Sequence, residues 1–186
     1  DEIAYNAHDI DDGVRSGLLT LEQLEAVPLF DRHRRAALAE YPALQGRRLL
    51  YEAIRRMLTL QVYDVIDATR AALRESGVAT LEQVRAAPVL VRFSPPMREQ
   101  SAALKRFLLH NLYRHPQVAE TTGRARRVVE ELYAAYCAAP SELPPPAGQP
   151  GVGLRRRVAD YIAGMTDRYA IREHERLTGH RLFAET

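Results

Sequence analysis

Helical periodicity runs through almost the whole chain and constrains its fold more than any other feature of the sequence. Apolar residues recur at spacings of three and four. In residues 1–17, for example, Ile3, Ala7, Ile10 and Val14 share one stripe. No stretch shows the strict alternation of apolar and polar residues that is typical of a half-buried strand. The sequence therefore predicts an all-α protein.

Stop and start signals divide this pattern into successive helices. Gly17 and Pro28 are typical helix ends, and a capping box begins at Thr20. Residues 140–153 are rich in proline and glycine, which predicts a surface loop or linker. The predicted helices cover residues 1–17, a short stretch after Thr20, 47–76, 94–115, 122–138 and 154–177.

One connector pattern occurs twice, 60 residues apart. RSGLLTLEQLEAVPLF at 15–30 and ESGVATLEQVRAAPVL at 75–90 share eight of sixteen positions. Each combines a glycine helix stop, a threonine capping box, a short helix and a proline stop. A solenoid needs three or more such units, so we interpret the pair as repeated use of one connector and not as a repeat protein.

Composition excludes several classes of protein. The single cysteine, Cys137, rules out a disulfide framework and a cysteine-only zinc site. The apolar runs fall short of the roughly 18 residues that a membrane-spanning helix needs, and no signal peptide opens the chain. We therefore expect a cytoplasmic protein without membrane contacts. The chain begins at Asp1, inside the first predicted helix, so we expect it to be the later part of a longer polypeptide.

The first predicted helix carries residues suited to binding and catalysis. On a helical wheel with Asp1 at 0°, Tyr5 lies at about 40° and Asp9 at about 80°, while the apolar stripe lies opposite. A carboxylate for a hard metal ion and an aromatic ring for stacking would thus stand one turn apart. The alternative is a solvated face whose acidic residues favour the N-terminal end of the helix dipole.

Three segments carry a resemblance to a known enzyme family. DEIAYNAHDIDDG, with TLEQL after it, resembles the last metal-binding helix of HD-domain deoxynucleoside triphosphate triphosphohydrolases, and the dGTPase-like subfamily fits best. FSPPMREQSAALKRFLLHNLYRHPQV and VADYIAGMTDRYAIREHERL resemble that family's C-terminal phosphohydrolase-associated region. The resemblance implies the C-terminal part of an all-helical HD-type phosphohydrolase, with catalytic-domain helices at 1–90 and the associated region at 91–186.

The resemblance also implies an activity and a site. Members of this family hydrolyse a deoxynucleoside triphosphate to a deoxynucleoside and inorganic triphosphate with a divalent metal ion, Mg²⁺ or Mn²⁺. Asp1 matches an aspartate of the metal site, Tyr5 the tyrosine that packs on the deoxyribose, and Asp9 the carboxylate that receives the sugar 3′-hydroxyl. The histidine, the His-Asp pair and the acid/base residues would lie upstream of Asp1. His8 and Asp9 lie downstream of that pair and do not correspond to it. Because the upstream ligands are not part of this sequence, we expect the fragment alone to be inactive.

Lys105 is a second candidate, because it is the one lysine beside 25 arginines. A lysine retained in an arginine-rich chain can mark a place that needs a compact point charge. It precedes Tyr113 by about two helical turns, in a segment that resembles the family's phosphate-side helix. We expect Lys105 and Arg106 to contact the triphosphate, with Tyr113 nearby. The alternative is a solvated surface lysine.

Charge is distributed unevenly along the chain, although the net charge is only +2. Residues 1–31 contain eight acidic residues against Arg15, whereas residues 32–56 contain seven arginines against Glu40 and Glu52. This asymmetry leaves two interpretations open. It fits complementary surfaces in a homo-oligomer, an assembly that the resembled family tends to form. It also fits a non-catalytic helical module that is regulatory or binds single-stranded nucleic acid.

Overall fold

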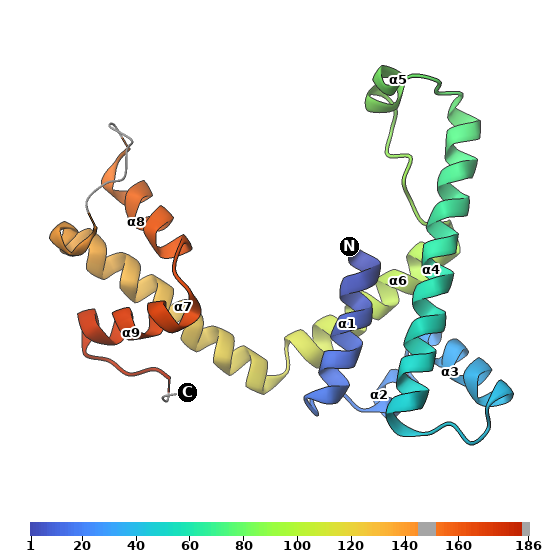
Figure 1. Ribbon diagram of the computed structural model, residues 1–186, viewed down its shortest axis with the longest axis horizontal. Coiled ribbons are helices and arrows are strands. Elements are labelled where there is room, and N and C mark those ends of the chain that lie inside the picture. The colour runs from blue at the N-terminus through green and yellow to red at the C-terminus, as the bar shows by residue number, and fades with distance from the viewer. Residues whose placement is uncertain (145–151, 184–186) are drawn as a thin grey trace. The chain divides into compact units, whose positions relative to one another are not determined.

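The structure is a computed structural model that describes residues 1–144 and 152–183. The described residues form helices and connecting segments, with no strand among them (Figure 1), which confirms the prediction of an all-α protein. The chain divides into two compact units, Asp1–His115 and Pro116–Thr186. None of the described helices combines the length and the apolar character needed to cross a bilayer.

The helices of the first unit begin and end largely where local signals place them. Gly17 and Gly77 have positive φ angles of 76° and 64°, a left-handed conformation that favours glycine at a helix end. At both Thr20 and Thr80 the predicted capping box forms. The order is α1 (Glu2–Arg15), α2 (Leu21–Leu24), α3 (Pro28–Glu40), α4 (Gly46–Ser76), α5 (Leu81–Ala86), α6 (Pro95–Leu108) and the π-helical turn η1 (Leu109–Tyr113).

The core of the first unit holds α1 against α6. Helices α1, α3, α4 and α6 pack on one another, and the buried side chains come from segments far apart in sequence. Full burial of one large aliphatic side chain contributes about 1.5–3 kcal/mol, so a shared core of this kind fixes the relative positions of the helices. Its fully buried members include Ile10, Leu24, Leu29, Phe30, Met57 and Leu104.

Helix α3 is not predicted by the sequence pattern, which treats Pro28 only as a stop. In the structure Pro28 also begins α3, because proline needs no N–H partner in the first turn and its fixed φ suits a helix. Leu29, Phe30 and Ala37 form the buried face. The arginines between them dilute the apolar pattern, so the sequence analysis predicts no helix over 28–40 and α3 is missed.

The two echoing segments share a threonine capping box and a short helix but differ in burial. Pro28 begins α3, whereas no helix begins at Pro88. Leu24 and Leu29 of the first segment are fully buried, whereas their equivalents Val84 and Val89 are 40% and 79% exposed. Figure 1 shows the difference in setting: α2 lies beside α1 and the start of α4, and α5 lies beyond the far end of α4. The capping box therefore sets the turn, and the surrounding helices decide whether its apolar residues are buried.

The second unit is built on α7 (Pro116–Ala138). The 3₁₀-helix η2 (Pro140–Glu142) follows, and α8 (Leu154–Ala163) and α9 (Asp167–Thr178) pack against α7. Helix α7 begins six residues earlier than the predicted 122–138. The core of this unit includes Val128, Leu132, Tyr136, Leu143 and Val158.

The prediction of one helix over 154–177 is wrong, because the chain breaks between α8 and α9. Gly164 follows α8, and the Thr166 side chain caps α9 by accepting a hydrogen bond from the backbone N–H of Tyr169 at 3.3 Å. The break allows both helices to pack on α7. Within the predicted loop 140–153, η2 occupies the start, and residues 145–151 lie outside the described residues.

The compact units divide between residues 115 and 116, whereas the resemblance places a domain boundary between 90 and 91. Packing explains the difference. Helix α6 contacts α1 and α3, and its Leu104 and Leu108 are part of the core of the first unit. The first segment of the associated region therefore belongs structurally to the unit that contains α1.

Candidate functional site

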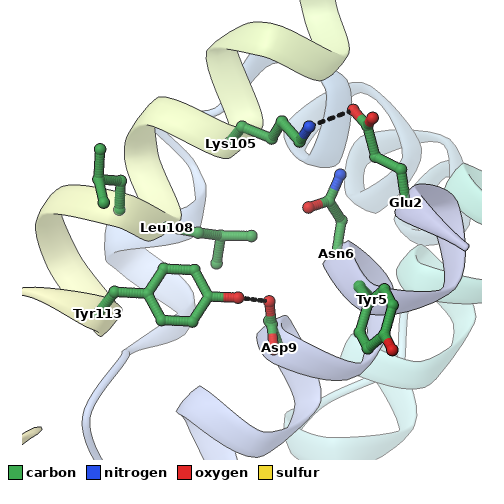
Figure 2. A pocket seen from close by; sticks show the side chains of 8 residues that line it. Glu2, Tyr5, Asn6, Asp9, Lys105, Leu108 and Tyr113 are labelled. Atoms are coloured by element: carbon green, nitrogen blue, oxygen red, sulfur yellow. Dashed lines mark hydrogen bonds and ion pairs between the residues drawn. The ribbon is translucent and has the colours of Figure 1, made fainter. Parts of the chain in front are cut away.

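A pocket of about 430 Å³ opens between α1 and the segment formed by α6 and η1 (Figure 2). Its volume falls within the range of about 300–1,000 Å³ that is typical of small-molecule sites. We call it the α1–α6 pocket. It is lined by Glu2, Tyr5, Asn6, Asp9, Lys105, Leu108, Leu109 and Tyr113.

Helix α1 presents its lining residues on a single face. On the wheel that starts at Asp1, Tyr5, Asp9, Glu2 and Asn6 fall at about 40°, 80°, 100° and 140°. The apolar face of α1 is held in the core, as the complete burial of Ile10 shows. With the apolar face buried, Glu2, Tyr5, Asn6 and Asp9 are left to line the pocket.

The π-helical turn η1 carries Tyr113 over the pocket. The backbone N–H of Arg114 bonds to the carbonyl of Leu109, five residues earlier, at 3.0 Å. In a regular α-helix Tyr113 would be rotated about 80° from Lys105. A π turn contains more residues than an α turn, so each residue rotates less. Lys105, Leu109 and Tyr113 therefore all face α1.

At one end of the pocket the Tyr113 hydroxyl donates a hydrogen bond to the carboxylate of Asp9. This bond, partial burial and the charge of Asp9 raise the pKa of Tyr113 from 10.0 to about 12. The cause is that ionisation of the phenol would remove the donor and place two negative charges side by side. The phenol therefore stays neutral at physiological pH and holds Asp9 in place as an acceptor.

At the other end Lys105 pairs with Glu2, with 2.9 Å between Nζ and Oε1. The Ser101 hydroxyl donates to the same carboxylate oxygen at 3.3 Å. The Lys105 and Glu2 side chains are 52% and 45% exposed. An ion pair this exposed contributes at most about 1 kcal/mol. An anionic ligand can therefore take the place of Glu2 at the Lys105 ammonium group.

Of the six predicted site residues, Tyr5, Asp9, Lys105 and Tyr113 come together in the pocket, and the other two do not line it. Asp1 is exposed at the N-cap of α1, and its side chain makes no capping hydrogen bond. Arg106 is exposed on α6. The ligand roles assigned to all six stay predictions.

The described residues offer few ligands for a divalent metal ion. Over residues 1–144 and 152–183, no three His, Cys, Asp or Glu side chains are arranged to hold a metal ion. Asp1 offers one carboxylate of the type that hard cations prefer. A metal ion at Asp1 would thus need ligands from outside these residues, and the described residues do not form a metal site by themselves.

Four lining residues are missed by the sequence analysis. Glu2 and Asn6 carry a signal that could have identified them, because they lie on the same side of the helical wheel as Tyr5, within about 100° of it. Leu108 and Leu109 carry none, because their positions depend on how α6 packs on α1 and on the π turn. A helical wheel predicts one wall of the pocket and gives no information on the wall opposite.

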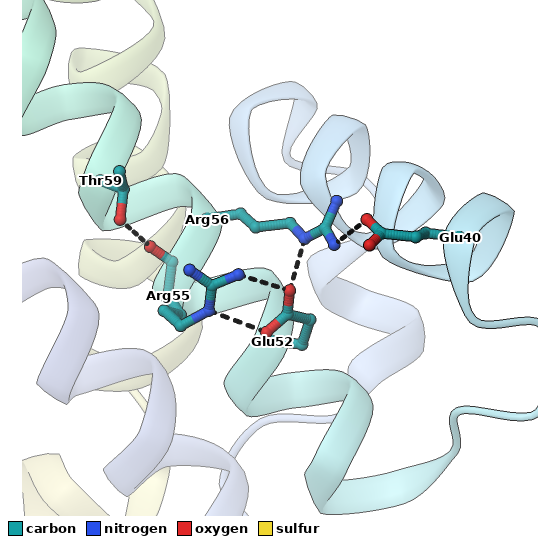
Figure 3. A network of polar contacts seen from close by, with 5 residues as sticks. All are labelled: Glu40, Glu52, Arg55, Arg56 and Thr59. Carbon is teal, nitrogen blue, oxygen red and sulfur yellow. Dashed lines mark hydrogen bonds and ion pairs between the residues drawn. The ribbon is translucent and has the colours of Figure 1, made fainter.

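Four of the seven arginines in segment 32–56 pair with carboxylates of the chain, and two of these, Arg55 and Arg56, form the network in Figure 3. Arg56 bonds to Glu40 at 2.5 Å and to Glu52 at 2.6 Å, and Arg55 bonds to Glu52 at 2.7 and 2.8 Å. The two guanidinium groups lower the pKa of Glu52 from 4.5 to about 2. Two further pairs join Arg34 and Arg35 to Asp31.

The chain is similar in sequence to a known domain and to several known proteins. Residues 91–176 match the phosphohydrolase-associated domain. The chain is 52% identical, over 95% of its length, to a deoxyguanosinetriphosphate triphosphohydrolase-like protein of Ralstonia nicotianae, of which it covers 46%. Proteins with the same description from Thiobacillus denitrificans and Nitrosomonas europaea are 52% and 44% identical over 95% of the chain, which covers 47% and 48% of them. The chain spans about half the length of the curated relatives it matches.

Proposed function

Because the chain belongs to the family of deoxyguanosinetriphosphate triphosphohydrolase-like proteins, we propose that it is the C-terminal part of a metal-dependent enzyme that hydrolyses deoxynucleoside triphosphates. The proposed reaction converts a dGTP-like nucleotide and water into a deoxynucleoside and inorganic triphosphate. The descriptions of the relatives and the phosphohydrolase-associated domain support the reaction class.

The observation that carries this proposal is that one pocket combines groups for a sugar with a group for phosphate. The Tyr5 ring, 68% exposed, offers an apolar face against which a deoxyribose can pack. Asp9, oriented by Tyr113, is an acceptor for a sugar hydroxyl. Lys105, at the opposite end, is a cation for a phosphate group. A deoxynucleoside triphosphate presents these groups in the same order along its length.

The proposal places a divalent metal ion, Mg²⁺ or Mn²⁺, at Asp1 together with ligands from the rest of the protein. Such an ion would polarise a phosphate and lower the pKa of a bound water. The residues of this chain bind and orient the nucleotide. With one ligand for the metal among them, we expect the chain to be inactive alone.

The test is a product assay on the full-length protein with each deoxynucleoside triphosphate and Mg²⁺ or Mn²⁺. Release of a deoxynucleoside with intact triphosphate supports the proposal. Release of pyrophosphate or single phosphate indicates a different phosphohydrolase, and absence of any product with metal bound contradicts an enzymatic role.

A matched pair of variants links that assay to the pocket. Tyr5→Ala should reduce the preference for deoxyribonucleotides over ribonucleotides, because the ring leaves little room for a 2′-hydroxyl. Tyr63→Ala removes a ring that is similarly exposed but does not line the pocket, so it should leave the preference unchanged. An equal effect of the two changes would contradict the role of Tyr5.

The pairing of residues 32–56 weakens the alternative of a nucleic-acid-binding module. Guanidinium groups held by Asp31, Glu40 and Glu52 are less available to phosphates than free ones. Binding of single-stranded DNA with a steep salt dependence would revive the alternative, and a flat response would exclude it. The homo-oligomer stays a prediction, which sedimentation of the full-length protein would test.

A further inference from the structure

Asn6 is buried, with 5% of its surface exposed, yet its side-chain nitrogen Nδ2 has no hydrogen-bond partner. Nearly all buried polar groups in folded proteins are paired, and an unpaired donor destabilises the fold. In the described part of the chain, Asn6 alone among such residues lines the α1–α6 pocket. The others are His33, Gln61, Thr69 and His115.

The Asn6 amide lies between the two polar pairs of the pocket. Figure 2 shows its nitrogen directed toward the Lys105–Glu2 pair and away from the Tyr113–Asp9 pair. The amide N–H and the ammonium of Lys105 are thus two donors at the same end of the pocket. Glu2 is the acceptor beside them, and it bonds to Lys105 and not to Asn6.

We propose that Asn6 binds the phosphate chain of the substrate, by donating its Nδ2–H to a phosphate oxygen that Lys105 also contacts. This inference rests on the proposed function, which supplies the class of ligand. Tyr5, Asp9 and Tyr113 occupy the sugar end, so the phosphates lie toward Asn6 and Lys105. An oxygen with a negative charge accepts a stronger hydrogen bond than a neutral one, which suits a donor with no other partner. Bound phosphate takes the place of Glu2 at Lys105.

Asn6→Leu in the full-length protein separates this role from a structural one. Leucine has the same branching at Cγ but no donor. Because the change replaces an unpaired buried group with an apolar one, the melting temperature should stay the same or rise. Binding of inorganic triphosphate, measured by calorimetry, should weaken about tenfold or more. A merely structural Asn6 would give the reverse: a lower melting temperature and unchanged affinity.

Asn111→Leu is the matched control. The Asn111 Nδ2 already donates to the backbone carbonyl of Phe107 at 2.9 Å, and its side chain does not line the pocket. This variant should melt at a lower temperature and bind inorganic triphosphate as the wild type does. The two variants are thus expected to differ from the wild type in opposite ways: Asn6→Leu loses triphosphate affinity and no stability, whereas Asn111→Leu loses stability and no triphosphate affinity.

A second ligand, deoxyguanosine, distinguishes failure of this inference from failure of the proposed function. Asn6→Leu should bind deoxyguanosine within about twofold of wild type, since the nucleoside carries no phosphate. If Asn6→Leu weakens the binding of both ligands equally, the assignment of Asn6 to phosphate is overturned. It is also overturned if Asn6→Leu binds inorganic triphosphate as tightly as the wild type does, while the wild type releases triphosphate from dNTPs. A wild type that binds neither ligand and releases no triphosphate overturns both.

Discussion

The Tyr113 hydroxyl donates a hydrogen bond to Asp9, a residue 104 positions earlier in the chain. The bond joins η1 to α1 at the sugar end of the proposed substrate site. An ionised carboxylate has about four acceptor positions, so Asp9 can accept from Tyr113 and from a ligand hydroxyl at the same time. Tyr113 therefore orients Asp9 and leaves acceptor positions of its carboxylate free for a ligand.

Alkaline titration should detect this bond. Because the bond to Asp9, together with partial burial and the charge of Asp9, raises the pKa of Tyr113 from 10.0 to about 12, the bond stabilises the fold below pH 10, and its contribution is lost as the pH rises from 10 toward 12. In Asp9→Asn the carboxylate charge is gone, so Tyr113 should ionise closer to pH 10. The measurement is phenolate absorbance against pH, with Tyr113→Phe as the reference. Identical curves for wild type and Asp9→Asn would contradict the assignment.

Removal of the hydroxyl should also reduce activity. In the full-length protein, Tyr113→Phe keeps the ring but leaves Asp9 without the donor that orients it, and we expect kcat/KM to fall about tenfold. Tyr169→Phe is the control, because the hydroxyl of Tyr169 bonds to that of Tyr161 in the second unit, outside the pocket. Similar losses in the two variants would mean that the effect is one of stability.

The wall of the site on α1 follows from the sequence, and the opposite wall does not. Tyr5 and Asp9 lie in one helix, whose fixed rotation per residue determines their geometry. The approach of Lys105 and Tyr113 depends on a core shared by helices some 100 residues apart, and periodicity within either helix carries no information on that packing. The resemblance to a family, and not the periodicity, placed these residues in one site.

Helix prediction from sequence succeeds here where capping and periodicity agree. The predicted helix 47–76 corresponds to α4, Gly46–Ser76, because an apolar stripe runs along it and Gly77 stops it. Helix α3 is missed because Pro28 is read as an end and arginines interrupt its apolar face. The break at Gly164 is missed because the apolar spacing continues through it, and tertiary packing on α7 decides in favour of two helices.

The echoing segments offer a matched test of context. Leu24→Ala removes a fully buried side chain, and we expect the free energy of unfolding to fall by about 2–5 kcal/mol. Val84→Ala, at the equivalent position of the exposed segment, should change it by less than about 0.5 kcal/mol. Urea unfolding of both variants measures the difference. Comparable losses would show that α5 is packed as tightly as α2.

Acid should weaken the network at Glu52. Arg55 and Arg56 lower the pKa of Glu52 from 4.5 to about 2, so its contribution to stability is present above pH 4.5 and is lost as the pH falls toward 2. Glu52→Gln removes that contribution. Urea unfolding at a series of pH values should show wild type and Glu52→Gln differing at neutral pH and converging near pH 2. Parallel curves over the whole range would contradict the shift.

The π turn at Leu109–Tyr113 accommodates one residue more than a regular helix would hold between Lys105 and Tyr113. Deleting one residue there, such as the exposed His110, would turn the wide turn into an ordinary one and leave Tyr113 about 20° from Lys105 around a regular helix. Tyr113 would then still face Asp9. A single-residue deletion at this turn should therefore be tolerated by the site, whereas the same deletion within the regular part of α6 would rotate Tyr113 away from Asp9 by about 100°.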